Sequence, residues 1–283
     1  LAKINLGLDV VRRREDGYHE VRMIMQTIHL YDLLEIQKIR EPGIQIVSNL
    51  SFLPVNENNL VYKAARLLQE EFALTDGISV KLTKRIPVAA GMAGGSTDAA
   101  AMLYAMNQLY DLGLSRRELM KRGVQIGADV PYCLMRGTAL AEGIGEKLTQ
   151  LPPMIKCPVL IAKPSISVST RFVYQNLKLD EQTNHPDIDA LMKDIREKDF
   201  DGVCAHMGNV LESVTIPNYP VIAEIKQQMM RSGAKASMMS GSGPTVFGLF
   251  EDGETAKRAL REMKRSGLAK QVYLTTIYNN RRK

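Results

Sequence analysis

The sequence lacks the features that mark several large classes of protein. Its 283 residues contain no tryptophan and only three cysteines, Cys133, Cys157 and Cys204, which form no C-x-x-C pair. An odd number of widely spaced cysteines favours a reducing compartment, so we expect a cytoplasmic protein. The four histidines show no metal-ligand spacing. No apolar run approaches the ~18 residues of a membrane-spanning helix, so we expect no membrane partner.

Common nucleotide-binding signatures are absent as well. No Gly-Lys-Ser/Thr follows the glycine-rich segment, which excludes a Walker A loop. No G-x-G-x-x-G lies near the first predicted strand, which argues against a dinucleotide fold. The protein-kinase strings H-R-D and D-F-G do not occur. The chain also begins at Leu1 rather than at methionine, so we expect that residues preceding it are missing.

Charge and composition describe an ordinary globular chain with a basic excess. Hydrophobic residues make up 45% and charged residues 24%, and the formal net charge is +6. That charge suits an anionic substrate or a nucleic acid. The basic runs at 12–14 and 281–283 have no interleaved aromatic residues, so we expect a solvated hairpin end and a tail rather than nucleic-acid binding.

The hydrophobic pattern predicts a mixed α and β chain of two domains. Prolines at 152, 153 and 158 mark the boundary, giving domains of residues 1–153 and 154–283. Predicted strands cover 4–10, 21–27, 34–37, 44–47, 78–82, 138–141, 159–162, 245–250 and 271–277, and predicted helices cover about 59–72, 99–109, 115–125, 170–177, 187–196, 219–231 and 254–265. A proline at 131 disfavours helix before it, so 127–131 is expected to be a loop. The second half resembles a small antiparallel sheet covered by helices, an α+β arrangement.

Residues 87–101, PVAAGMAGGSTDAAA, are the most informative stretch. A predicted strand runs into it and a helix of small residues runs out of it. Its glycines, Gly91, Gly94 and Gly95, let the backbone approach an anion closely. The helix start adds free N–H groups and the positive end of the helix dipole, so the segment predicts a phosphate-binding loop. The alternative is that the glycines only make a turn before an N-cap at Ser96 or Thr97.

Four further polar clusters are each weak alone. Lys3 and Asn5 share one face of the first strand, and by themselves they favour a face turned to water. Tyr18 and His19 follow the Asp-Gly turn, where they could be surface residues or contacts for a flat base. Asp129 stands in a loop in which a lone aspartate is usually a turn residue. The loop 240–244, SGSGP, could be a second anion-binding nest or only a connection.

In combination and in this order, these segments resemble the GHMP small-molecule kinases over essentially the whole chain. The resemblance rests on residues 2–6 (AKINL), 87–100 and 239–245 (MSGSGPT), with DGYH at 16–19 and IGADVP at 126–131. Two mild departures lie in the phosphate loop, where Met92 replaces the usual leucine and Ala93 the usual glycine. These changes could alter the flexibility of the loop but should not remove it.

The resemblance implies a fold, a reaction and a set of residues. It implies a domain similar to ribosomal protein S5 domain 2 and a ferredoxin-like second domain, with the active site in the cleft between them. The reaction would transfer the ATP γ-phosphoryl group, with Mg²⁺, to an alcohol on a small molecule that carries cytidine diphosphate. Asp129 would be the base, or a group that orients the hydroxyl, and Lys3 its charged partner. The resemblance further assigns three groups of residues. The ATP contacts are Asn59, Lys84, Pro87, Gly91, Gly94, Gly95, Ser96 and Thr97, and Ser96 is also assigned as a metal contact. The substrate contacts are Asn5, Tyr18, His19 and Tyr174, and the loop that lines the site from the second domain contains Gly241, Ser242 and Gly243.

Two alternatives stay open at this point. One is another kinase of the same family, acting on mevalonate or homoserine, neither of which has a base to stack on Tyr18 or Tyr174. The other is a nucleotide sensor on the same fold that does not catalyse, against which the presence of both Lys3 and Asp129 argues. The sequence does not indicate an oligomeric state.

Overall fold

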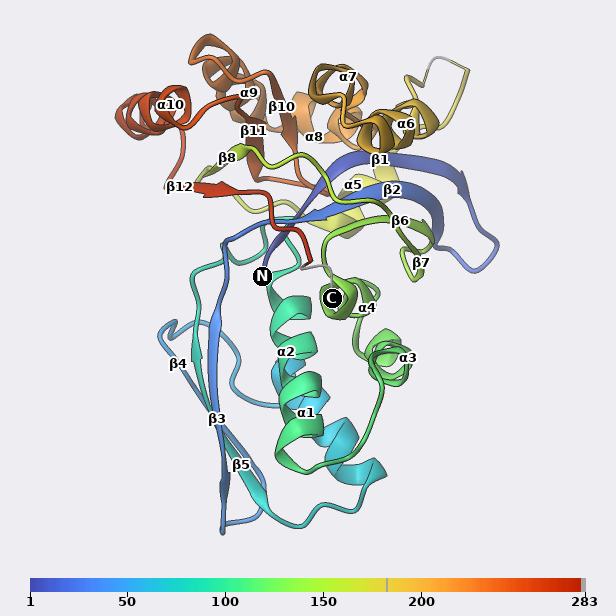
Figure 1. The fold of residues 1–283 in the computed structure, drawn as a ribbon, viewed down its shortest axis with the longest axis vertical. Coiled ribbons are helices and arrows are strands. Elements are labelled where there is room, and N and C mark those ends of the chain that lie inside the picture. The colour runs from blue at the N-terminus through green and yellow to red at the C-terminus, as the bar shows by residue number, and fades with distance from the viewer. Residues whose placement is uncertain (182, 281–283) are drawn as a thin grey trace. The chain divides into compact units, whose positions relative to one another are not determined.

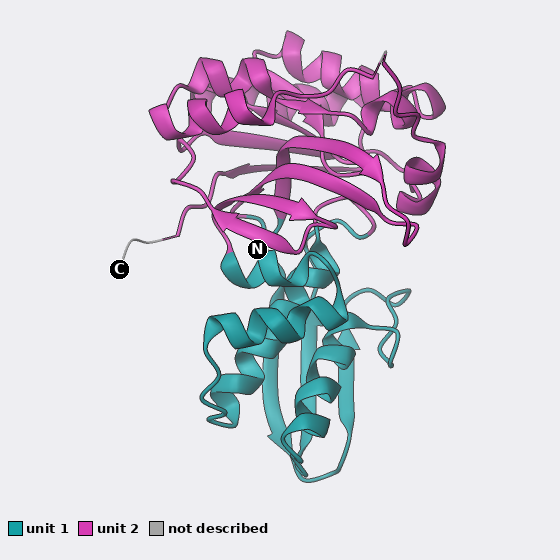
Figure 2. Ribbon diagram, turned by 90° about the vertical axis from the view of Figure 1, so that its right-hand side faces the viewer, with its two compact units in different colours: residues 1–2, 30–88, 93–135 teal, residues 3–29, 89–92, 136–283 magenta. Residues whose placement is uncertain are grey.

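The computed structural model describes residues 1–181 and 183–280, and the basic run at 281–283 lies outside that range (Figure 1). The chain forms two compact units, which Figure 2 colours separately. Unit 1 comprises residues 1–2, 30–88 and 93–135, and unit 2 comprises residues 3–29, 89–92 and 136–283. Both units therefore draw on separate stretches of sequence. The predicted boundary at 153/154 divides the sequence rather than these units, and it stays a prediction.

Unit 1 is a three-stranded sheet with helices on one side (Figure 1). Strand β5 (Gly77–Thr83) lies in the middle, antiparallel to β3 (Leu33–Ile39) and parallel to β4 (Ile44–Ser48). The helices are α1 (Leu60–Glu71), α2 (Gly94–Leu109), α3 (Arg116–Ile126) and α4 (Val130–Met135). Most of the buried side chains of β5, α1 and α2 are apolar, and this core packs the helices against the sheet.

Unit 2 contains two sheets. The first has the order β7-β6-β2-β1-β9, from β1 (Lys3–Arg13), β2 (His19–Thr27), β6 (Thr138–Gly143), β7 (Lys147–Gln150) and β9 (Gly208–Asn209). The second is antiparallel, with the order β10-β11-β8-β12, from β8 (Pro158–Lys163), β10 (Ala236–Met239), β11 (Val246–Leu249) and β12 (Gln271–Thr276).

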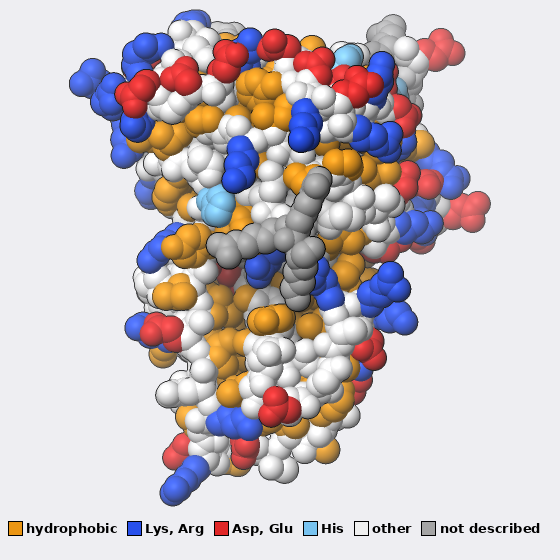
Figure 3. Space-filling view, viewed as in Figure 1, with side chains coloured by type: hydrophobic (Ala, Val, Ile, Leu, Met, Phe, Trp, Pro, Cys, Tyr) orange, Lys and Arg blue, Asp and Glu red, His pale blue; other side chains and the backbone are white. Residues whose placement is uncertain are grey.

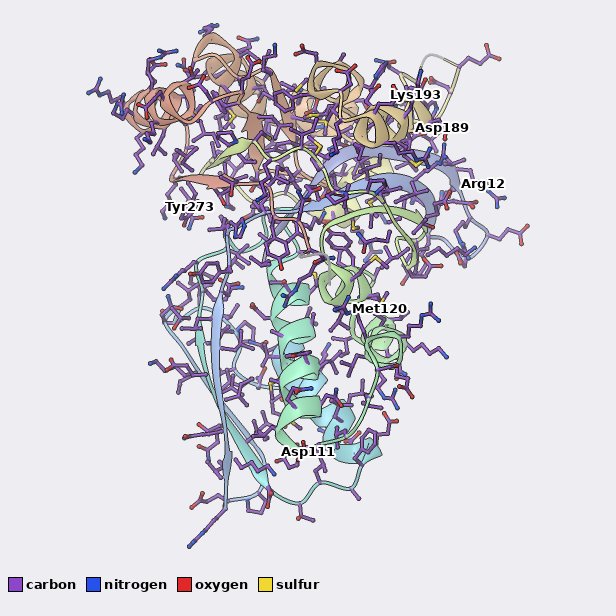
Figure 4. The ribbon with its side chains drawn as sticks, in the orientation of Figure 1. Arg12, Asp111, Met120, Asp189, Lys193 and Tyr273 are labelled. Carbon is purple, nitrogen blue, oxygen red and sulfur yellow. The ribbon has the colours of Figure 1, made fainter. Side chains whose placement is uncertain are left out.

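The described residues of unit 2 also form the helices α5 (Thr170–Asn176), α6 (Ile188–Glu197), α7 (Phe200–His206), α8 (Glu212–Asn218), α9 (Val221–Arg231) and α10 (Gly253–Ser266). Positively and negatively charged side chains lie on the outer surface of this helical layer, at the top of Figure 3. Helix α6 carries Asp189 and Lys193 (Figure 4), and Asp189 forms an ion pair with Arg22 of β2 at 2.6 Å. Among the described residues, no helix combines the length and apolar character needed to cross a membrane.

Most of the predicted elements are confirmed, including the opening hairpin, the helix predicted at 115–125 and the antiparallel sheet of the second half. The prediction of a loop through 127–131 is wrong, because α4 begins at Val130 with Pro131 in its first turn. Proline is tolerated there since first-turn N–H groups have no partner within the helix. The short elements β7, β9, α7 and α8 lie outside the predicted segments.

Candidate active site

The predicted phosphate loop leads into the open end of a helix. Helix α2 begins at Gly94, its N-cap is Ala93, and no side chain caps it. The alternative interpretation, an N-cap at Ser96 or Thr97, is therefore wrong, because both residues already lie within the helix. Pro87 is buried at the start of the loop, whereas Gly95 is exposed and Ser96 half-buried. The first turn thus offers uncapped N–H groups and the positive end of the dipole, which suit a phosphate.

The loop holds alanine in backbone conformations that favour glycine. Ala93 has a φ of 55° and Ala89 a φ of 50°, both in the left-handed region. That region costs a residue with a Cβ atom roughly 1–2 kcal/mol. Ala93, identified above as a departure from the family pattern, therefore stores strain directly before the helix.

We expect Ala93→Gly to leave the free energy of unfolding unchanged or to raise it by up to about 1 kcal/mol, because relief of the left-handed strain offsets the added freedom of the unfolded chain. The matched control is Ala105→Gly within α2, which should lower stability by about 1 kcal/mol. Urea unfolding of both variants measures the contrast. Equal losses in the two would show that Ala93 is not strained.

Behind the loop lies a buried ion cluster that the sequence analysis missed. The Lys84 ammonium pairs with Asp98 of α2 at 2.6 Å and also with Asp32, and all three side chains are at least 96% buried. A Cβ atom at Gly94 would lie 3.3 Å from the Lys84 nitrogen, so the cluster sits directly under the helix start. Asp32 also accepts hydrogen bonds from the backbone of Arg85 and Ile86. The cluster therefore joins the end of β5 to the first turn of α2.

The cluster has one lysine for two carboxylates. Burial, offset by Lys84 and reinforced by Asp32, raises the pKa of Asp98 to about 7. The Oδ1 atom of Asp98 is buried and has no hydrogen-bond partner among the described residues. A lysine that is buried needs acidic partners, but only the fold shows that those of Lys84 are Asp32 and Asp98.

The other two predicted nucleotide residues in unit 1 have structural partners. Asn59 is the N-cap of α1: its side chain accepts from the Val61 N–H at 2.9 Å and donates to the Pro54 carbonyl at 2.6 Å. Thr97 is buried and its hydroxyl donates to the Leu1 carbonyl at 2.7 Å.

The predicted base, Asp129, follows a segment that approaches the first turn of α2 within unit 1. Asp129 is half-buried in the three-residue connection between α3 and α4, and its carbonyl accepts from the Cys133 N–H at 3.0 Å. A Cβ atom at Gly127 would lie 3.9 Å from the Ser96 hydroxyl. The fold thereby brings the segment before Asp129 to the first turn of α2, as a phosphoryl-transfer site requires.

In unit 2, the strand β1 buries a lysine and an asparagine side by side. Lys3 is 5% exposed and Asn5 is fully buried, and the Lys3 ammonium donates to Asn5 Oδ1 at 2.6 Å. The interpretation that this face is turned to water is therefore wrong. A buried amine without a hydrogen-bond partner is costly, and Asn5 supplies such a partner to Lys3.

The two glycine-rich segments of unit 2 lie against each other and against Asn5. The Ser240 hydroxyl donates to the Gly91 carbonyl at 2.9 Å. A Cβ atom at Gly91 would lie 2.1 Å from the Ser240 carbonyl oxygen, and one at Gly241 would lie 3.7 Å from Asn5 Oδ1. The approach at Gly91 has no room for a Cβ atom and so requires glycine, and the contact of Gly241 places the 240–243 loop beside the Lys3–Asn5 pair. Gly243 has a φ of 89°, and Ser242 is buried with its hydroxyl 2.8 Å from that of Thr170 on α5.

Helix α5 also brings an aromatic ring to the hairpin. The rings of His19 and Tyr174 have centroids 5.1 Å apart at an angle of 42°. Burial and the charge of Arg13 lower the pKa of His19, so its ring is neutral at pH 7 and offers one donor and one acceptor. Tyr18 precedes it and is 62% exposed, with its ring open to a ligand.

The two units thus hold different parts of the predicted site. Unit 1 groups the helix start, Lys84 and Asp129, and unit 2 groups the Lys3–Asn5 pair, the 240–243 loop and the His19–Tyr174 rings. The described residues contain no group of three or more metal-ligating side chains. A surface cavity of about 970 Å³ in unit 2, between the 176–187 segment and α8, is lined by none of the predicted site residues.

Comparisons with known proteins identify the chain's relatives. Residues 59–137 match the model of the GHMP kinases N terminal domain, and residues 191–269 match that of the GHMP kinases C terminal domain. The chain is 58% identical, over 98% of its length and 96% of the relative, to the 4-diphosphocytidyl-2-C-methyl-D-erythritol kinase of Lachnospira eligens. It is 54% identical, over 99% and 96%, to the same-named kinase of Lachnoclostridium phytofermentans.

Solved structures agree in fold. A crystal structure of 4-(cytidine 5'-diphospho)-2C-methyl-D-erythritol kinase has a TM-score of 0.85 and 32% identity, covering 99% of this chain and 98% of that one. A homoserine kinase from Cytophaga hutchinsonii shares the fold, with a TM-score of 0.73 and 20% identity over 98% and 94% of the two chains. With its uncapped helix start, its two glycine loops and these full-length relatives, the chain belongs to the GHMP kinases and has their two-domain α/β fold.

Proposed function

We propose that this GHMP kinase transfers the γ-phosphoryl group of ATP to a hydroxyl of 4-diphosphocytidyl-2-C-methyl-D-erythritol, giving the 2-phosphate and ADP in isoprenoid precursor biosynthesis. One observation carries the choice of substrate: His19 and Tyr174 place two rings together on the unit that buries Lys3 and Asn5. Mevalonate and homoserine have no base for such rings to hold. The names of the full-length relatives support the same choice.

The nucleotide phosphates are proposed to bind the start of α2. The uncapped N–H groups of its first turn fit an anion, and the exposed Gly95 leaves room for one. The remaining proposed ATP contacts are Pro87, Gly91, Gly94, Ser96, Thr97, Asn59 and Lys84. Because the side chains of Asn59, Thr97 and Lys84 already have partners, we propose that they act mainly by shaping the site.

The chemistry is proposed to rest on Asp129 and Lys3. Asp129 would accept the proton of the attacking hydroxyl or orient that hydroxyl, and Lys3 would offset the negative charge of the transferred group. Mg²⁺ would accompany ATP and neutralise charge on its phosphates, with Ser96 as its proposed protein contact. The scarcity of clustered acids in the described residues fits a metal that is held mainly by the nucleotide.

The cytidine base is proposed to stack on Tyr18 and Tyr174 and to form hydrogen bonds with His19, while Asn5 contacts polar groups of the substrate. We expect Tyr18→Ala to weaken affinity for the cytidine substrate by about 5- to 150-fold, since stacking on one ring contributes roughly 1–3 kcal/mol. ATP affinity should stay near that of the unmodified protein. Steady-state kinetics with each substrate varied in turn measure both values.

The matched control is Tyr104→Ala, which removes a ring of similar exposure, 56%, from α2. Its kinetic constants for the cytidine substrate should not change. If Tyr18→Ala weakened ATP and substrate equally, Tyr18 would not stack on the base. Phosphorus NMR of the product tests the reaction itself, because one new phosphomonoester resonance should appear as ADP forms.

A further inference from the structure

Asn209 holds the 240–243 loop through its side-chain amide. Its Nδ2 donates to two carbonyl oxygens of the loop segment, that of Met239 at 2.9 Å and that of Gly241 at 2.8 Å. Its Oδ1 accepts from the Leu211 N–H at 3.0 Å. Every polar group of this side chain is therefore used, and the residue is 8% exposed. The amide bridges two parts of the chain that are about 30 residues apart.

The position of Asn209 connects the loop to the strand of Lys3 and Asn5. Asn209 ends β9, which pairs in parallel with β1 at Gly7 and Leu8. The next N–H, that of Val210, donates to the Leu8 carbonyl at 3.0 Å. The pairing of β9 with β1 therefore connects Asn209, and through it the loop, to the strand that carries the buried Lys3.

The far side of the loop is tied to the proposed base site. The Ser242 hydroxyl lies 2.8 Å from that of Thr170, in the first turn of α5, and Tyr174 lies one turn further along that helix. The loop turns at two glycines with positive φ, Gly241 at 59° and Gly243 at 89°, and glycine backbone is conformationally free, so the loop depends on outside contacts to keep its shape. Asn209, at the end of β9, supplies such a contact, because it donates hydrogen bonds to two backbone carbonyls of the loop segment.

We propose that Asn209 is a positioning residue for phosphoryl transfer: it fixes the 240–243 loop between the Lys3–Asn5 pair and the helix that bears Tyr174. This proposal rests on the proposed function. Asn209 touches neither reactant, and it acts by keeping the loop that lines the substrate in register with β1. A displacement of the reacting group by as little as 1 Å can cost on the order of 100-fold in rate.

The test is Asn209→Asp. The substitution keeps the size of the side chain and the hydrogen bond that it accepts from Leu211. It replaces the donating Nδ2 with an oxygen, which would face the carbonyl oxygens of Met239 and Gly241 and could not donate to them. We expect kcat for the cytidine substrate to fall by at least about tenfold, and its KM to rise. The KM for ATP should change less, because the start of α2 is built in unit 1. A variant that only folded less well would lower the concentration of active protein, and so the apparent kcat, but it would leave the KM values for both substrates unchanged.

The control is Asn218→Ala, which removes a single amide-to-carbonyl bond of 2.8 Å to Val214 on α8. It should leave both KM values and kcat per folded molecule unchanged. If Asn209→Asp does not fold, Asn209→Ala, which removes the donors without repulsion, serves in its place. Constants equal to those of the unmodified protein in a folded Asn209 variant would overturn the positioning role. Absence of turnover in the unmodified protein would instead overturn the proposed function.

Discussion

Asp129→Asn should lower turnover about 10²–10⁴-fold while ATP affinity stays near that of the unmodified protein, since general-base help contributes that much. Asparagine keeps the shape of the side chain and cannot accept the proton of the hydroxyl. Because Asp129 is half-buried and its backbone carbonyl, not its carboxylate, starts α4, the fold should persist. Single-turnover phosphorylation and ATP titration measure the two effects.

The control for loss of a carboxylate in the same unit is Asp111→Asn, at the opposite end of α2 (Figure 4). It should leave turnover unchanged. Lys3→Met adds a second test, because residues that act on one chemical step give losses that do not add. We expect the double variant Lys3→Met with Asp129→Asn to be scarcely slower than the worse single variant. Near-normal turnover of Asp129→Asn would remove the base role and leave positioning as the source of catalysis.

Lys84→Met should produce the largest loss of stability. The substitution leaves Asp32 and Asp98 buried without a counter-ion, and breaking a buried ion pair from one side costs about 3–5 kcal/mol. Urea unfolding measures the loss. Lys81→Met, three residues earlier on β5, removes a lysine that is 64% exposed and paired with Glu35, so it should cost at most about 1 kcal/mol.

The deficit in free energy of unfolding that Lys84→Met causes should also depend on pH. The pKa of Asp98 is raised to about 7, so at pH 5 the carboxyl carries its proton and tolerates the loss of Lys84 better than at pH 8. The deficit should therefore grow as pH rises through 7. Adding Asp98→Asn should recover part of the loss at pH 8. A deficit no larger than that of Lys81→Met would show that the cluster contributes little to stability.

Periodicity and cap signals were sufficient to predict most of the elements. The alternation of 4–10 predicted a strand and the apolar patterns of 59–72 and 115–125 predicted helices; these are local signals, and β1, α1 and α3 confirm them. Helix α8 was missed because it is seven residues long and contains Pro217. Strand β9 has two residues and exists only because β1 pairs with it, which no local pattern reveals.

The residues of the candidate site likewise fall into those that a local sequence pattern predicts and those that it does not. Glycine spacing predicted a loop that leads into a helix, because glycine favours turns with positive φ such as that at Gly91. The burial of Lys3 was not predictable from its own strand, since two polar residues on one face look like a solvated edge. Asp32, Asp98 and Asn209 were missed because their roles depend on partners that are distant in sequence.

The measurement that tests the central claim most directly is ADP release by the purified protein with Mg-ATP and three alternative acceptors: 4-diphosphocytidyl-2-C-methyl-D-erythritol, mevalonate and homoserine. We predict turnover with the cytidine compound alone, which would make Tyr18, His19 and Tyr174 the residues that select it. Turnover with mevalonate or homoserine, and none with the cytidine compound, would contradict the account.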